Sequence, residues 1–139
     1  MYFLVTMRKY TIENKGMAIE KGDFHTAFSQ LLEVSFESFK GEKLNRTTCI
    51  KFYTMIFNSL TDLLMKSGIQ ICNEAANYVA QCYYDGVVLN ENEQGLDPNV
   101  FTQRAKLENI PTKDLGLIAV MLKKTDFVWP LIEELKRRN

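Results

Sequence analysis

The sequence predicts an all-α fold, with about six helices packed as a single compact domain around a central hydrophobic helix at residues 47–67. Apolar residues recur at intervals of three and four along most of the chain, which is the spacing that gathers them on one face of a helix. The chain has 139 residues, of which 46% are hydrophobic and 24% charged. That size and balance suit one hydrophobic core, so we expect residues 1–139 to form a single helical domain.

The first residues differ from the rest of the chain. Residues 1–5 are apolar and include types that favour extended backbone, so they predict a short N-terminal strand. We expect residues 1–16 to be extended or flexible. The apolar run is too short for the core of a signal peptide or for a membrane span, and the three cysteines lack the spacing of a zinc site. We therefore expect an intracellular, cytoplasmic protein that does not enter a membrane.

Three helices are expected between the N-terminal residues and a polar loop at 90–99. Asp23 is a favourable N-cap for the first of them. The second is apolar nearly all round, which is typical of a helix that others surround, and Gly68 is expected to end it. We place the three helices at residues 23–40, 47–67 and 69–84.

Residues 97–139 are expected to form a C-terminal three-helix unit. Asp97 followed by Pro98 is a strong start signal for a helix that ends near Asn109. Thr112 is expected to cap the second helix, and the third follows the turn at residues 125–126. The apolar residues expected to pack the last two helices are Leu115, Ile118, Ala119, Leu122, Val128, Leu131, Ile132 and Leu135.

Signatures of enzymes are nearly absent from the sequence. His25 is the only histidine, and no phosphate-binding glycine loop or nucleophile elbow is present. Glu33 and Glu37 lie one helical turn apart, but the pattern favours a solvated helix face. Residues 90–101 partly match a calcium-binding loop, yet Phe101 occupies the position that requires a bidentate glutamate. We therefore expect no catalytic residue, cofactor or metal.

Protein binding is the function class that the composition favours. Lysine plus arginine equals aspartate plus glutamate at 17 each, and the chain carries nine Phe and six Tyr. We expect a small non-enzymatic regulatory or adaptor protein that acts through protein–protein contacts and associates with itself as a homodimer. Whether Trp129 completes the core or meets a partner stays open. The candidate contact residues are Trp129, Phe127, Phe52, Met55 and Ile56.

The alternative is a DNA-binding transcriptional regulator that uses residues 112–138 as a helix-turn-helix. Ala119 supplies the small residue that lets two helices cross closely, and the apolar spacing fits this geometry. Glu133 and Glu134 oppose it, because carboxylates on a recognition helix repel phosphates. The candidate phosphate contacts are Lys123, Lys124, Arg137 and Arg138.

Overall fold

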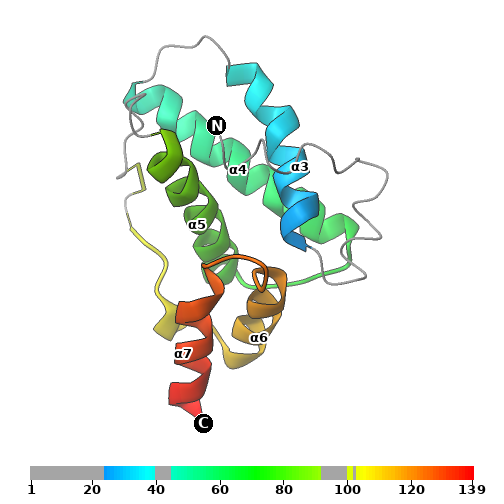
Figure 1. Cartoon of the computed structure of the whole chain (residues 1–139), viewed down its shortest axis with the longest axis vertical. Coiled ribbons are helices and arrows are strands. Elements are labelled where there is room, and N and C mark those ends of the chain that lie inside the picture. The colour runs from blue at the N-terminus through cyan, green and yellow to red at the C-terminus, as the bar shows by residue number, and fades with distance from the viewer. Residues whose placement is uncertain (1–23, 40–44, 92–99, 102) are drawn as a thin grey trace.

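A computed structural model describes residues 24–39, 45–91, 100–101 and 103–139, with side chains omitted for residues 87–91. Over these residues the fold is all-helical, as predicted, with no strand (Figure 1). The predicted N-terminal strand, the Asp23 cap and the Asp97–Pro98 start lie outside the described residues. The elements are α3 (Phe24–Phe36), η2 (Glu37–Phe39), α4 (Arg46–Lys66), α5 (Asn73–Glu91), η4 (Leu107–Asn109), α6 (Thr112–Met121) and α7 (Val128–Arg138).

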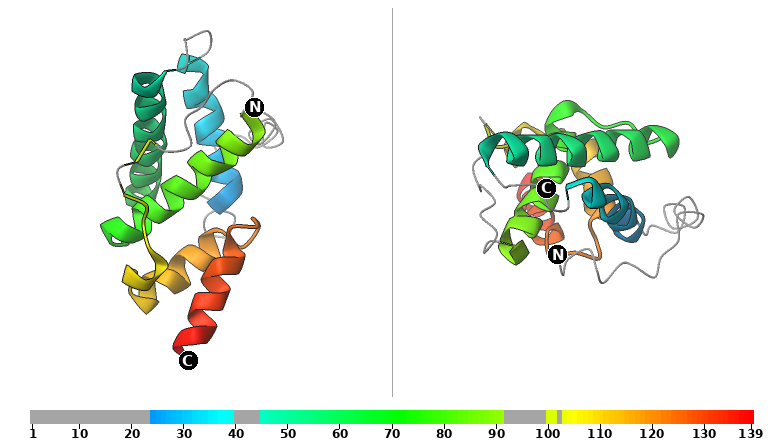
Figure 2. Two further views of the ribbon diagram at one scale, coloured as in Figure 1. Left: turned by 90° about the vertical axis from the view of Figure 1, so that its left-hand side faces the viewer. Right: turned by 90° about the horizontal axis from the view of Figure 1, so that it is seen from above.

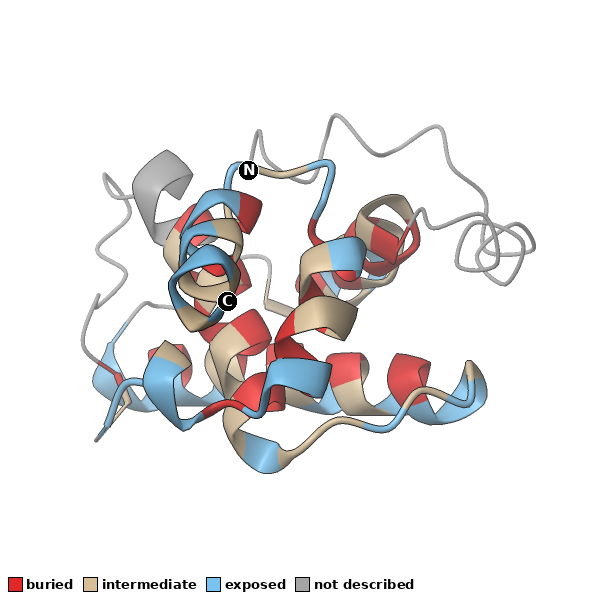
Figure 3. Ribbon diagram, turned by 90° about the horizontal axis from the view of Figure 1, so that it is seen from below, coloured by how far each residue is buried: buried red, intermediate tan, exposed pale blue. Residues whose placement is uncertain are grey.

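The helices form two groups. Figures 1 and 2 show α3, α4 and α5 packed together at one end, with α6 and α7 side by side at the other end next to the C-terminus. Aromatic rings fill much of the core between α3, α4 and α5. Phe28 meets Tyr83 edge-on with their ring centroids 4.7 Å apart, and Phe36 stacks on Phe52 at 4.4 Å. Figure 3 shows the buried residues on the sides of the helices that face one another.

Helix α4 is the longest helix, but it is amphipathic and not surrounded by others. Its buried residues include Phe52, Ile56 and Leu60, whereas Ile50 and Met65 are exposed on the opposite side. The expectation of a central helix over 47–67 is therefore not met. Its apolar residues are divided between a core face and an outer face. Helix α5 is the more central element, because it contacts α4, α6 and η4.

Both ends of α4 follow from local chemistry. The side chain of Asn45 accepts a hydrogen bond from the N–H of Thr48 (2.9 Å), which satisfies a backbone donor in the first turn. At the other end Gly68 has φ +70°, a conformation that costs little only for glycine. The N–H of Ile69 then reaches back to the carbonyl of Leu64 (3.0 Å), as in a Schellman motif. The predicted stop at Gly68 is confirmed.

The α-helix expected over residues 98–109 is not present in the described part of this segment. Among the described residues there, only Leu107–Asn109 are helical, as one 3-10 turn. Residues 100–101 and 103–106, which we call the strap, are not helical. Side chains of α5 bind backbone groups of the strap that an α-helix would use for itself, as shown below. Within the described residues, the C-terminal unit therefore has two α-helices.

Candidate interaction surface

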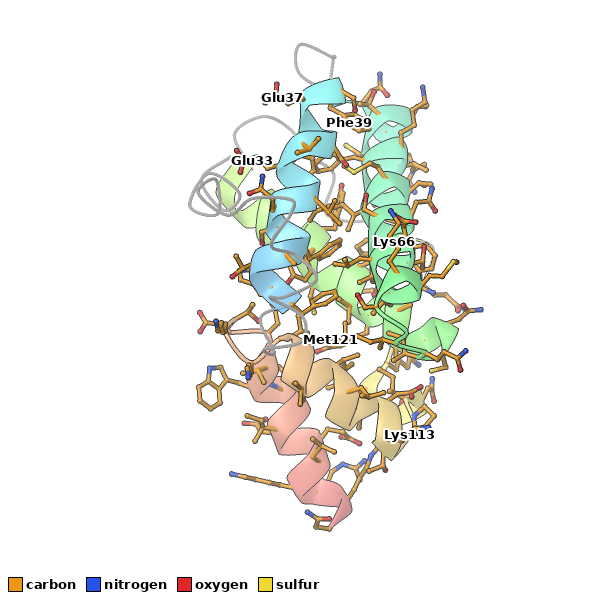
Figure 4. The ribbon with its side chains drawn as sticks, turned by 90° about the vertical axis from the view of Figure 1, so that its right-hand side faces the viewer. Glu33, Glu37, Phe39, Lys66, Lys113 and Met121 are labelled. Carbon is orange, nitrogen blue, oxygen red and sulfur yellow. The ribbon has the colours of Figure 1, made fainter. Side chains whose placement is uncertain are left out.

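Helices α6 and α7 pack against each other through the residues that the sequence predicted. The buried members of this set are Leu115, Ile118, Leu122, Val128 and Leu131, with Ala119, Ile132 and Leu135 half-buried. Met121 is also buried, and Figure 4 places it where α6 meets the upper group of helices. The carboxylate of Asp114 accepts a hydrogen bond from the N–H of Cys72 (3.0 Å), which ties α6 to the start of α5.

The turn between α6 and α7 is held by Thr125. Its hydroxyl donates to the carbonyl of Leu122 (2.8 Å) and accepts from the N–H of Phe127 (3.1 Å). The ring of Phe127 then packs near the buried ring of Tyr83, with centroids 5.8 Å apart. Phe127, a predicted contact residue, therefore anchors the turn to the core.

Trp129 is held away from the core by this arrangement. Its neighbours Val128 and Leu131 are buried, whereas Trp129 itself is 61% exposed. Lys123, Lys124, Asp126 and Glu133, which precede Trp129 in the turn or follow it by one helical turn, are also exposed. We call Trp129 and these four charged residues the Trp129 surface. In this structure Trp129 does not complete the core.

Arg138 fixes the far end of α7. Its Nη1 donates to the carbonyl of Ile110 (2.7 Å) and to the hydroxyl of Thr112 (3.0 Å). Its Nη2 donates to the carbonyl of Leu107 (2.9 Å), and its Nε donates to Glu134 (3.0 Å). All three nitrogens of Arg138, a predicted phosphate contact, thus donate hydrogen bonds within the chain. Thr112 accepts this bond and makes no capping hydrogen bond, so its expected role as a cap is wrong.

Glu134 joins the last basic residues of α7. Arg137 donates to it from Nε (3.0 Å) and Nη2, alongside Arg138. These hydrogen bonds lower the pKa of Glu134 to about 2. Two of the four predicted phosphate contacts are therefore paired with a carboxylate of their own helix, whereas Lys123 and Lys124 are exposed.

The contact residues predicted on α4 lie elsewhere. Phe52 and Ile56 are buried in the core, and Met55 is half-buried. Helix α4 belongs to the upper group in Figure 1, away from α7, so these residues do not share a surface with Trp129. Glu33 on α3 and Glu37 on η2 project to the side away from α4 (Figure 4).

Two potentially reactive side chains in the described part of the chain, those of His25 and Cys82, have structural surroundings that account for them. His25 Nδ1 lies 2.7 Å from the hydroxyl of the buried Tyr83. Burial raises the pKa of the Cys82 thiol to about 12, which leaves it protonated and a poor nucleophile. No group of three or more potential metal ligands is found among the described residues.

An open hollow of about 510 Å³ lies where the end of α4 meets the start of α5. None of the residues that line it has an acidic, basic or thiol side chain. Its lining residues are Thr61, Leu64, Met65, Gly68, Ile69, Gln70, Ile71, Asn73 and Ala76.

A row of polar residues on α5 was not predicted as a site from the sequence. Glu74, Gln81 and Asp85 are separated by seven and four residues, which places them on one face of a helix. All three bind the strap. Their spacing along the helix is the feature of the sequence that could have identified them as one polar face.

Comparison with protein-family models, curated proteins and solved structures finds no match to this chain. Among the described helices, none has the length and apolar character needed to cross a membrane.

Proposed function

We propose that this chain is a non-enzymatic protein-interaction module that associates with itself through the Trp129 surface. The observation that carries the proposal is the 61% exposure of Trp129 on a helix whose other side is fixed to the core. Tryptophan supplies a large rigid contact area and is enriched at the centre of protein interfaces. An adaptor or regulatory role follows from this mode of action.

A second copy is the partner that the surrounding charges favour. Lys123 and Lys124 lie on the turn before Trp129, and Glu133 lies one helical turn after it. In a two-fold contact the same surface meets itself in reverse, so the lysines of one copy face the glutamate of the other. The equal numbers of basic and acidic residues in the chain, 17 each, suit self-association better than a strongly charged partner.

The second candidate function is DNA binding through α6 and α7. The exposure of Lys123 and Lys124 favours it, since lysines that contact phosphates lie on the surface. Arg138 does not, because its donors are taken by Leu107, Ile110 and Thr112. Glu133 is exposed on the helix that would enter the groove, which also weighs against DNA.

The test is the solution mass of the purified chain, measured by light scattering at low and high salt. We expect a dimer, at twice 16.1 kDa, that salt and duplex DNA leave unchanged. Trp129→Ala should shift the mass towards the monomer without loss of helicity, because the indole is largely outside the core. Val120→Ala is the matched control, since Val120 is 54% exposed on the neighbouring helix.

Two results would count against the proposal. A wild-type chain that is monomeric at all concentrations, or a dimer that Trp129→Ala leaves intact, excludes the Trp129 surface as the contact. A chain that takes up duplex DNA at low salt and releases it at high salt supports the second candidate instead. In that case Lys123→Ala with Lys124→Ala should flatten the salt dependence.

A further inference from the structure

Side chains of α5 bind the backbone of the strap. Gln81 is only 5% exposed, and its amide Nε2 donates to the carbonyl of Gln103 (3.2 Å) while its Oε1 accepts from the N–H of Ala105 (2.8 Å). In an extended chain, a carbonyl and an N–H two residues apart point to the same edge. Gln81 therefore satisfies the strap as a neighbouring strand would. Glu74 adds a third backbone contact, from the N–H of Lys106 (2.8 Å).

Two side chains of the strap, those of Phe101 and Arg104, contact specific residues of α4 and α5. The ring of Phe101 meets Tyr53 and Tyr84 edge-on, at centroid distances of 4.9 and 5.5 Å. The guanidinium of Arg104 lies 4.8 Å from the Phe101 ring centroid and forms an ion pair with Asp85. The residues of α4 and α5 that contact the strap, which we call the strap seat, thus fit an aromatic residue followed three positions later by arginine. They are Tyr53, Glu74, Gln81, Tyr84 and Asp85.

The strap is held by both apolar and polar contacts. Val100 is buried in the core, and Phe101 packs on two tyrosine rings. The other contacts are the hydrogen bonds to the backbone of the strap and the ion pair of the half-exposed Arg104. Every copy of the chain carries both the strap and the strap seat, so each of these contacts can also form between two copies.

We propose that the strap seat accepts the strap of a second copy, so that two chains exchange the strap together with η4, α6 and α7. This inference rests on the self-association proposed above and supplies a contact for it. The strap of this chain is the sequence whose fit to the seat is seen, and every copy carries it. Exchange reproduces the same hydrogen bonds and ring contacts between chains, so its main cost is the loss of independent motion of the two copies.

Charge reversal on the two sides of the seat tests the exchange. Asp85→Arg places like charges in the seat of one chain, and Arg104→Asp does so in another. When the two variants are mixed, an exchanged pair restores an opposite-charge contact in both seats. We expect native mass spectrometry to detect the mixed dimer in about tenfold excess over either homodimer. The double variant Asp85→Arg with Arg104→Asp is the matched control, because it repairs the ion pair within one chain.

The experiment is carried out with Trp129→Ala in every chain, so the Trp129 surface contributes nothing to the result. Absence of the mixed dimer overturns the exchange, even if the wild-type chain dimerises through Trp129. A mixed dimer combined with no effect of Trp129→Ala on the wild-type mass supports the exchange and rejects the Trp129 surface. Circular dichroism of each variant checks that the helices are retained.

A second measurement needs no charge reversal. A fluorescent peptide with the sequence of residues 100–106 should bind the Phe101→Ala chain, whose own strap is weakened, at least tenfold more tightly than it binds the wild-type chain. The same peptide carrying Phe101→Ala should bind neither chain. If the normal peptide fails to bind the weakened chain, the seat does not accept a strap from outside, and the proposal is wrong.

Discussion

Arg138 lies in the last turn of α7, where a solvent-facing arginine would ordinarily contribute little to stability. Its side chain is only 18% exposed, and it donates to the carbonyls of Leu107 and Ile110 and to the hydroxyl of Thr112. These acceptors belong to η4, to the segment that leads into α6, and to the first residue of α6. Arg138→Ala should therefore loosen the C-terminal unit as well as the end of its own helix.

The expected magnitude follows from the hydrogen bonds that are lost. A hydrogen bond from a charged donor contributes about 1.5–3 kcal/mol, and an unpaired buried carbonyl costs about 1–3 kcal/mol. Ile110 is buried, so its carbonyl has little access to water after truncation of the arginine. Water can reach the more exposed Thr112 and offset part of the loss there. We expect a decrease of about 2–3 kcal/mol in the free energy of unfolding.

Urea denaturation followed by circular dichroism measures this decrease. Arg137→Ala is the matched control, because Arg137 binds the same Glu134 but is largely exposed. It should lower the midpoint of unfolding much less than Arg138→Ala does, because exposed ion pairs contribute little stability. Arg138→Lys should fall between Arg138→Ala and wild type, since one ammonium group cannot reach all the acceptors. If Arg138→Ala is no more destabilising than Arg137→Ala, the assignment of Arg138 as a structural residue is wrong.

Three further predictions concern two glycines and a pH dependence. Gly68→Ala should destabilise the chain by about 1–2 kcal/mol, because φ +70° is strained for alanine although its Cβ meets no atom within 4 Å. Gly116→Ala, in open space within α6, should instead stabilise it by about 0.5–1 kcal/mol in the same urea experiment. The stabilising contribution of Glu134 should be present above its ordinary pKa near 4.5 and be lost as the pH falls towards 2, because Arg137 and Arg138 lower its folded pKa. Urea midpoints of wild type and Glu134→Gln should therefore converge below pH 4, and a constant difference down to pH 2 would contradict this.

Helical periodicity was sufficient to predict the helices that bury a stripe of apolar side chains. The stripe of Leu115, Ile118 and Leu122 lies where its spacing placed it, and Gly68 ends α4 because no other residue adopts its conformation as cheaply. Periodicity failed to orient α4. Apolar residues occur nearly all round that helix, so the sequence could not show that Phe52 is in the core and Met65 is outside it.

The strap was mispredicted because its conformation depends on distant residues. Asp97 and Pro98 favour a helix start, but this local preference is small compared with a set of tertiary hydrogen bonds. Gln81 and Glu74 lie more than twenty residues away in the sequence, and no rule of spacing within residues 98–109 reveals them. Trp129 could be nominated from its residue type, but its exposure depends on how Phe127 packs on Tyr83.

Exchange of the strap would change the contacts of the strap seat but not those of the Trp129 surface. Arg138 binds Leu107, Ile110 and Thr112, which all follow the strap in the chain. These residues would move together with α7 in an exchange, so the hydrogen bonds of Arg138 would stay within one chain. The hydrogen bonds of Gln81, by contrast, would come to join two chains. Trp129 would keep its immediate surroundings on α7 in either arrangement. For this reason a substitution at Trp129 and a charge reversal in the strap seat measure separate contacts, and their effects on the free energy of association should add.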